Sequence, residues 1–383
     1  MLKIAILTTS RADYGFLSPL IKKMKKTNKL NPFLIVCGSH LSKKHGLTIN
    51  EIKKDNIKIH YKINSYNEKF STEESIKKVV QGFSAAIKKL CPDLIFLPAD
   101  RYEILAAANV ALVNNIPIAH YAGGQITEGA WDNSIRHAVS KISHLHFVAT
   151  KNCKKRLIQM GEEASRIFIC GSLGIDNIKN TKFLKKGELE KKLNFKLSSK
   201  FALVTYHAET LKNYSSKKIF TSILKALDNF KDIKIIFTSP NIDRDSKEIT
   251  NLILRYLKRN KHRVIYKASL GRDLYLSCLK YASFVIGNSS SGIIETPSFK
   301  TPTINIDDRQ KGRVFSKNII NCKSSKKKII GSIKKSLSLK FNRSIKNISN
   351  PYGKGKSAEK IIKILGKTNL KNLIKKKFYE IKF

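Results

Sequence analysis

Short apolar runs alternate with amphipathic stretches along nearly the whole chain, and no other feature of the sequence restricts the fold as much. The first instance is the apolar run Lys3–Thr8, the turn Thr9–Gly15 and a helical stretch from Leu17 to Lys26. Continuous apolar runs of this length are typical of buried strands in parallel sheets, whose faces are covered by amphipathic helices. The alternation therefore predicts an α/β fold with doubly wound parallel sheets.

The pattern falls into two series, which a Lys-rich polar stretch around Asn177–Lys200 separates. Further strands are expected at Pro32–Gly38, Asp93–Pro98, Ile116–His120, Ile167–Cys170, Phe201–Tyr206, Ile233–Thr238, Arg263–Tyr266, Phe284–Ile286 and Thr303–Ile306. Further helices are expected at Ile76–Leu90, Glu103–Asn114, Lys151–Met160, Ser216–Phe230, Ser246–Arg259, Leu270–Tyr281 and Ser357–Leu365. Because 383 residues suffice for two domains, we expect Rossmann-like domains over 1–176 and 177–365. A basic tail, 366–383, should pack back on the fold.

The net charge of +46 would suit a polyanionic partner such as RNA or an anionic membrane. However, only 13 of the 74 basic residues are Arg, and the Lys residues are spread over every helical stretch. Proteins that read nucleic acid favour Arg for bidentate contacts, so this distribution indicates a solvated surface instead. We expect neither a nucleic-acid nor a membrane partner, and a basic RNA-binding protein is the alternative from a different functional class.

The six cysteines are scattered and form no C-x-x-C pair, which favours buried, reduced thiols. The first residues, Met1–Thr8, have the pattern of a strand and lack the charged region and cleavage site of a signal peptide, so a cytoplasmic location is expected. No apolar run reaches the ~18 residues of a membrane helix. His144 and His146 share one face of an expected strand, but the sequence offers no third ligand, so packed histidines are expected rather than a metal site.

The stretch Val285–Glu295 (VIGNSSSGIIE) has the pattern of a strand, a turn rich in hydroxyl groups and the start of a helix. The first amides of a helix have no partner within it and carry the positive end of its dipole, so they bind phosphate well. Ser289 and Ser290 would add hydroxyl groups, and Gly292 would let the backbone come close. Glu295 would reach a ribose diol. A serine-capped helix with nothing bound fits the same residues.

Charged residues also follow the strands of the first series. Arg11 lies in the turn after the first strand, and Asp100 and Arg101 follow a later one. Ligands of open α/β sheets bind at the carboxyl ends of strands, so all three are candidates. A surface arginine, or a helix cap with an ion pair, would look the same. Asp132 and Arg136 are four residues apart and share a helix face, either within a site or as a plain surface ion pair.

Two further polar loops are expected at the same sheet edge as the serine turn. His207 lies in the loop Tyr206–Thr210, and Asn241 lies in Ser239–Asp243, and each loop follows a strand. Several polar loops that converge at one edge of a parallel sheet indicate a ligand site.

Together, the motifs resemble those of a known family, the hydrolysing UDP-N-acetylglucosamine 2-epimerases, including the branch that acts on nucleotide-linked N,N'-diacetylbacillosamine in legionaminic acid synthesis. The resemblance covers nearly the whole chain, in the order and at spacings similar to those of the family. The motifs are TSRADYG (9–15), ADRYE (99–103), AHYAGGQITEGAWDNSIRHAVSKISHLHF (119–147), GSLGIDNI (171–178), TYHAETL (205–211), SPNID (239–243), GNSSSGIIETPSF (287–299) and NIDDRQKGR (305–313).

The resemblance implies two Rossmann-like domains that face across a cleft, as in B-type glycosyltransferases (GT-B), with the nucleotide mainly on the second. It implies removal of the sugar's C2 proton with loss of the nucleoside diphosphate, which gives a glycal. Water addition then yields the free C2-inverted sugar for a sialic-acid-like product. It implies no metal or redox cofactor, a nucleotide-sugar substrate and a homo-oligomer, either a dimer or a tetramer. A non-hydrolysing 2-epimerase and a GT-B glycosyltransferase are the rival readings.

Carried over position by position, the resemblance assigns proton transfer to Asp100 and Asp132 and places His207 beside the diphosphate. The other implied contacts with the nucleotide or the sugar are Arg11, Arg101, Asn241, Ser289, Ser290, Gly292, Glu295 and Arg309.

The chain departs from the family pattern at several positions. Ala99 and Ala208 stand where relatives often have Gly and Pro. The family usually has a carboxylate beside the Gly-Gly pair, but here those positions are Ala122 and Gln125. A neutral amide cannot act as a general base at pH 7. Either Glu128 replaces the carboxylate, or the addition step is slower or altered.

Overall fold

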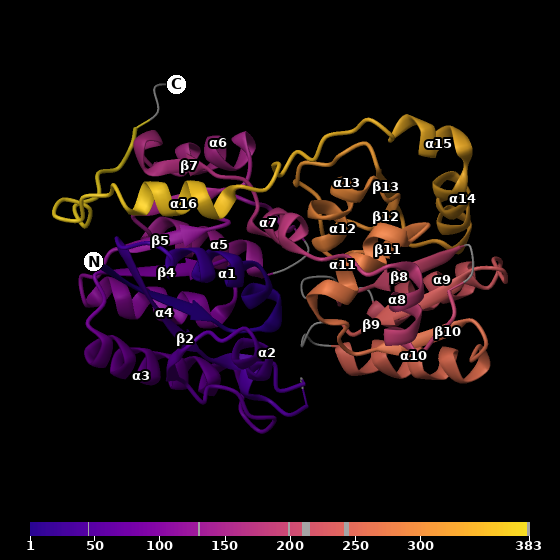
Figure 1. Cartoon of the computed structure of the whole chain (residues 1–383), viewed down its shortest axis with the longest axis horizontal. Coiled ribbons are helices and arrows are strands. Elements are labelled where there is room, and N and C mark those ends of the chain that lie inside the picture. Colours follow the sequence, from indigo (N-terminus) through magenta and orange to yellow (C-terminus); the bar gives the residue numbers. More distant parts are fainter. Residues whose placement is uncertain (45, 129–130, 198–199, 209–214, 241–244, 381–383) are drawn as a thin grey trace. The chain divides into compact units, whose positions relative to one another are not determined.

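The computed structural model describes residues 1–44, 46–128, 131–197, 200–208, 215–240 and 245–380. The chain divides into two compact units (Figure 1). The first unit contains Met1–Gln125, Asp132–Lys179 and Tyr352–Phe383, and the second contains Ile126–Trp131 and Asn180–Pro351. Two parallel α/β units confirm the predicted fold class.

The first unit is built on a seven-stranded parallel sheet with the strand order β3-β2-β1-β4-β5-β6-β7. Its strands are β1 (Leu2–Thr8), β2 (Leu30–Val36), β3 (Ile59–Lys62), β4 (Leu94–Pro98), β5 (Ile118–Tyr121), β6 (Leu145–Val148) and β7 (Ile167–Ile169). Its helices are α1 (Arg11–Met24), α2 (Ile49–Lys54), α3 (Thr72–Leu90), α4 (Tyr102–Val113), α5 (Asp132–Ile142), α6 (Lys151–Gln159), α7 (Leu173–Asn180) and α16 (Ser357–Leu365), with short 3-10 turns at Gly38–Leu41 and Ala164–Arg166. The sequence did not predict β3.

Successive residues of β1 enter different cores, as the pleat of a strand requires. Ile4 and Ile6 pack in one core, while Ala5 and Leu7 pack in the core on the opposite face. Helices α1 and α16 contribute to the first core, and α3 and α4 contribute to the second. Both faces of the sheet are therefore buried, which explains why its strands are continuously apolar.

The second unit has a six-stranded parallel sheet with the order β10-β9-β8-β11-β12-β13. Its strands are β8 (Phe201–Thr205), β9 (Lys234–Thr238), β10 (Val264–Lys267), β11 (Phe284–Gly287), β12 (Thr303–Ile306) and β13 (Ile319–Cys322). Its helices are α8 (Lys186–Leu193), α9 (Ser216–Leu227), α10 (Ser246–Arg259), α11 (Gly271–Tyr281), α12 (Ser291–Ile294), α13 (Thr296–Phe299), α14 (Lys326–Leu337) and α15 (Leu339–Ser344). This order places β11 between β8 and β12.

Helix α16 differs from the expected domain organisation, in which 177–365 formed one domain. Figure 1 shows this helix, in yellow, with the elements of the first unit. Its residues Ala358, Ile361 and Leu365 are buried in the core of that unit. Asp176 of α7 also accepts the backbone N–H groups of residues 356, 357 and 358 at 3.0, 2.9 and 2.7 Å, and so caps the start of α16. The apolar face of α16 is buried against α1, which explains why this helix belongs to the first unit.

The tail after α16 also contacts the first unit. Arg166 donates to the backbone carbonyl groups of Leu373 and Lys375 at 2.8 and 2.9 Å. The backbone N–H of Tyr379 donates to Gly161 O at 3.0 Å. Among the described residues, no helix combines the length and apolar character that crossing a membrane would need.

Candidate functional site

In the second unit, polar loops follow the neighbouring strands β8, β11 and β12. Strand β11 ends at Gly287, whose φ is 144° and where a Cβ atom would lie 1.8 Å from Thr205 O. Only glycine fits here, because the backbone of β8 occupies the space of any side chain. The turn that follows is therefore held against the end of β8.

Asn288 joins three loops in one cluster. Its side chain is fully buried; Oδ1 accepts the N–H of His207 at 2.7 Å, and Nδ2 donates to His207 O at 2.8 Å. Its backbone oxygen accepts Nη1 of Arg309 at 3.0 Å and Nε2 of Gln310 at 2.8 Å. The sequence reasoning missed Asn288, because an asparagine in a turn carries no signal of its long-range partners. The predicted residues His207, Ser289 and Arg309 are thus brought together.

The charges in this cluster suit an anion. His207 is buried, and its burial together with the Arg309 guanidinium lowers the imidazole pKa well below its usual range. The ring is therefore neutral at pH 7 and can exchange hydrogen bonds without adding charge. The guanidinium supplies the positive charge and several N–H donors, which match phosphate oxygens.

The serine turn is less helical than the sequence suggested. Two four-residue helices, α12 and α13, replace one longer helix, with Pro297 near the start of α13. Ser289 and Ser290 precede α12 and are partly exposed. Gly292 is buried, and a Cβ atom there would lie 3.1 Å from Thr303 Cγ2, so close packing explains this glycine. Such short helices have a weaker dipole than one long helix. Hydroxyl and guanidinium groups must therefore contribute more to the binding of any phosphate here.

Glu295 lies at the junction of α12 and α13, where surrounding protein atoms displace water. This desolvation raises its carboxyl pKa to about 7, although a hydrogen bond from Ser291 opposes the shift. Ser291 Oγ donates to Glu295 Oε2 at 2.5 Å, and Tyr275 Oη lies 2.7 Å from Ser291 Oγ. Asn241 lies outside the described residues, so its predicted contact is not placed.

In the first unit, Asp100 follows β4 and forms an ion pair with Arg136 of α5. Arg136 is 1% exposed, and its Nη1 also donates to Gln125 O at 2.9 Å. The guanidinium thus links the loop after β4 to the loop after β5. The sequence paired Arg136 with Asp132 by helix spacing, and it did not predict the contact with Asp100.

A buried histidine, His120, contacts the backbone of the loop that carries Asp100. Ala99 has a φ of 59°, in the left-handed region, and its carbonyl oxygen lies 2.8 Å from Nε2 of His120. Nδ1 of the same ring lies 3.1 Å from Ser140 Oγ. Burial lowers the pKa of His120 to about 3, so the neutral ring donates to Ala99 and accepts from Ser140.

The other predicted residues of the first unit have varied surroundings. Arg101 makes a bidentate contact with the buried Glu103, at 3.0 and 3.2 Å, and occupies the N-cap position of α4. Arg11 and Asp132 are partly exposed and are the first residues of α1 and α5. Glu128 belongs to the second unit and pairs with Lys311 at 3.0 Å, with 43% of its side chain exposed. Exposed pairs of this kind contribute little to stability.

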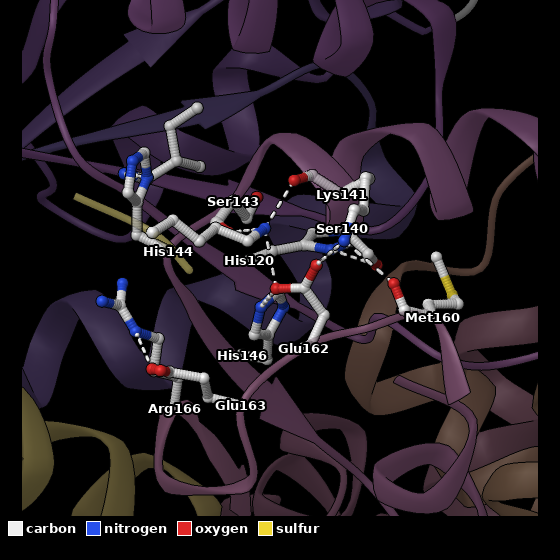
Figure 2. A network of polar contacts seen from close by, with 12 residues as sticks. His120, Ser140, Lys141, Ser143, His144, His146, Met160, Glu162, Glu163 and Arg166 are labelled. Carbon is white, nitrogen blue, oxygen red and sulfur yellow. Dashed lines mark hydrogen bonds and ion pairs between the residues drawn. The ribbon is translucent and has the colours of Figure 1, made fainter. Parts of the chain in front are cut away.

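His146 takes part in a buried network of polar contacts. Figure 2 shows its ring beside Glu162, with Nε2 3.0 Å from the carboxylate. Lys141 and Lys376 also pair with Glu162, at 3.1 and 2.7 Å. Nδ1 of His144 accepts the N–H of Ile118 at 3.1 Å. Within the described part of the chain, no group of three or more His, Cys, Asp or Glu residues could hold a metal ion.

A family model described as "UDP-N-acetylglucosamine 2-epimerase" matches residues 22–366. A GDP/UDP-N,N'-diacetylbacillosamine 2-epimerase (hydrolyzing) of Campylobacter jejuni is 44% identical over 322 residues, which cover 83% of this chain and 84% of that protein. A UDP-N,N'-diacetylbacillosamine 2-epimerase (hydrolyzing) of Legionella pneumophila is 34% identical and covers 95% of both chains. The polysialic acid biosynthesis protein P7 of Escherichia coli is 36% identical and covers 100% of this chain and 98% of that one.

Two solved structures show the same fold. The UDP-GlcNAc 2-epimerase of Neisseria meningitidis bound to UDP-GlcNAc has a TM-score of 0.82 and 19% identity, over 96% of this chain and 100% of that chain. The S. aureus MnaA-UDP structure has a TM-score of 0.79 and 21% identity, over 94% of this chain and 95% of that chain.

Proposed function

The chain belongs to the UDP-N-acetylglucosamine 2-epimerase family, and we propose that it is a hydrolysing 2-epimerase of a nucleotide-activated 2-acetamido sugar. The substrate is UDP-N-acetylglucosamine or a UDP- or GDP-linked N,N'-diacetylbacillosamine, as the names of the similar proteins suggest. The products are the free C2-inverted sugar and the nucleoside diphosphate, and the sugar feeds sialic or legionaminic acid synthesis.

The observation that carries this proposal is the cluster around Asn288. A leaving diphosphate needs positive charge and hydrogen-bond donors where its negative charge develops. Arg309 and the neutral His207 supply these groups, and Ser289 and Ser290 follow Asn288 directly. Glu295 is assigned to the ribose. Its side chain is partly exposed, and its raised pKa indicates that neighbouring protein atoms desolvate the carboxyl group.

The proton chemistry is assigned to Asp100 and Asp132 of the first unit. In the first step a carboxylate takes the C2 proton, the C1–O bond breaks, and the diphosphate leaves as the C1–C2 double bond of the glycal forms. In the second step water adds a hydroxyl group at C1 and a proton at C2 on the opposite face. Arg11 and Arg101 are proposed to contact the phosphates or the sugar, as is Asn241.

We also propose a cytoplasmic homo-oligomer. All six cysteines are free, as expected in a reducing compartment. Light scattering of the purified protein tests the oligomeric state, and a monomer at micromolar concentration would contradict it.

The function is tested by product analysis in D2O. Purified protein is incubated with UDP-N-acetylglucosamine and with UDP- and GDP-linked diacetylbacillosamine, and the products are followed by NMR. We expect free inverted sugar with one solvent deuterium at C2, together with nucleoside diphosphate. Inverted sugar that is still linked to its nucleotide would support a non-hydrolysing epimerase instead. Asp100→Asn and Asp132→Asn should abolish turnover, and activity in both would overturn the site assignment.

A further inference from the structure

A chain of hydroxyl groups leads to Glu295 from within the second unit. Tyr275 on α11 lies 2.7 Å from Ser291, and Ser291 donates to Glu295 Oε2 at 2.5 Å. An ionised carboxylate only accepts hydrogen bonds, so the Ser291 hydroxyl must point to Glu295 and accept from Tyr275. Burial raises the pKa of the Tyr275 hydroxyl, so this group stays protonated at neutral pH and can donate to Ser291.

This polarity divides the serines of the turn between two tasks. The Ser291 hydroxyl hydrogen is already directed to Glu295 and is not available to a phosphate. Ser289 and Ser290, which precede α12, remain as hydroxyl donors to a diphosphate.

The same contacts fix the orientation of the Glu295 carboxyl group. Its Oε2 atom is held by Ser291, whereas Oε1 has no hydrogen-bond partner among the residues that the structure describes. A carboxylate with one oxygen held and the other open presents a single acceptor in a defined direction. A site built to bond a hydroxyl group rejects analogues that lack the hydroxyl, because its buried polar group is then left unpaired.

We propose that Tyr275 and Ser291 are positioning residues that aim Glu295 at a ribose, so that the second unit selects ribonucleotides over 2′-deoxyribonucleotides. The inference rests on the proposed function, in which Glu295 contacts the ribose. Contacts with the phosphates alone could not distinguish a ribonucleotide from a 2′-deoxyribonucleotide, whereas a positioned Glu295 carboxylate could.

The test is isothermal titration of the full chain with UDP and 2′-deoxy-UDP, and with GDP and 2′-deoxy-GDP, at pH 8. We expect the wild-type protein to bind the ribonucleotide at least about tenfold more tightly than its 2′-deoxy counterpart. Tyr275→Phe and Ser291→Ala should each reduce this ratio to about threefold or less. Affinity for the deoxynucleotide should stay the same. Glu295→Gln should remove the preference.

Tyr256→Phe is the matched control, because Tyr256 is a buried tyrosine of the same unit whose hydroxyl bonds to Asp228 at 2.7 Å. This variant should keep the wild-type ratio. The proposal is overturned if Tyr275→Phe and Ser291→Ala keep it too, or if they weaken both nucleotides equally. A protein with the ribose preference but no epimerisation would contradict the proposed function only. A protein that epimerises without any ribose preference would contradict the positioning role only.

Discussion

Each unit has one buried polar side chain that joins the loops of its own predicted residues, Arg136 in the first unit and Asn288 in the second. Each contacts loops that follow different strands, and neither is more than 1% exposed. Buried polar groups that are fully bonded restrict a site to one geometry, whereas loss of one partner leaves the others unpaired. Substitution at these positions should therefore disturb several predicted residues at once.

Arg136→Ala should lower kcat about 100-fold, because Asp100 loses the group that orients it. KM for the nucleotide sugar should change much less, since the cluster around Asn288, which is proposed to hold the diphosphate, lies in the second unit. Added guanidinium ion should restore part of the activity. These constants are measured by coupled release of the nucleoside diphosphate.

Arg156→Ala is the control for this prediction, because Arg156 donates to Gly124 O at 2.5 Å beside the same loop and has no described contact with Asp100. It should retain most of kcat. Equal losses in both variants, without rescue of Arg136→Ala, would mean that Arg136 only supports the loop.

Glu295→Gln should become more stable relative to the wild type as pH rises. The folded carboxyl group has a pKa of about 7 against an ordinary value of 4.5, so the ligand-free wild-type protein loses stability as pH rises through this interval. Glutamine does not ionise and avoids this loss. Thermal melting at pH about 5 and about 8 checks the sign, and a difference in Tm that shrinks towards pH 8 would contradict it.

At this scale the sequence predicted many candidate side chains but few of their partners. Strand ends and small-residue turns marked His207 and Ser289, because local patterns reveal where loops of a parallel sheet converge. The contacts Arg136–Asp100 and Tyr275–Ser291 join different elements and leave no periodic signal in the sequence. Helix spacing suggested Asp132 as the partner of Arg136, since only local neighbours are visible there.

At the scale of structural elements, charged side chains attach the C-terminal tail to the rest of the first unit. Burial raises the pKa of Glu162, but His146 and Lys376 outweigh this effect and hold it at about 2. The Glu162 carboxylate is fully buried, and Lys376 also donates to the backbone oxygens of Lys141 and Ser143 at 2.5 and 2.9 Å. One lysine therefore neutralises a buried charge and ties the tail to two other elements.

Lys376→Gln should lower the stability of the first unit by about 1–3 kcal/mol at pH 7. Because the pKa of Glu162 is depressed in the folded state, this penalty is present above about pH 4.5 and fades as pH falls towards 2. Thermal melting across this pH range measures it. Lys377→Gln, at the exposed neighbouring position, should leave Tm unchanged, and an equal loss in both variants would contradict the anchoring role.

Element types could be predicted from the sequence more reliably than element boundaries and partners. The predicted limits of α10, β12 and α16 match the structure, because clear apolar periodicity and polar flanks define them. Helix α1 starts six residues before the predicted Leu17, since Asp13 bonds to the backbone of Thr9 and Ser10 and caps the helix early. The placement of α16 depends on its contacts with α1 and α7, which its own periodicity does not reveal.

For the whole molecule, we expect the net charge of +46 to reflect a solvated, Lys-rich surface and not a nucleic-acid site. We expect weak RNA binding at low salt that does not depend on sequence and falls steeply between about 50 and 200 mM salt. Added RNA should not change nucleotide-sugar turnover at about 150 mM salt. Filter binding and the epimerase assay check the two statements. Tight, sequence-dependent binding at the higher salt would contradict them.

Because α16 follows the second unit in the sequence but belongs to the first, it affects the order in which the two units can complete folding during synthesis. Residues up to Pro351 complete the second unit, while the first still lacks the helix that carries Ala358 and Ile361 into its core. Until this helix emerges, α1 exposes an apolar face and Asp176 has no N–H groups to cap. The half that is made first is therefore the half that matures last, and a nascent chain stalled before Tyr352 presents a finished second unit beside an unfinished first one.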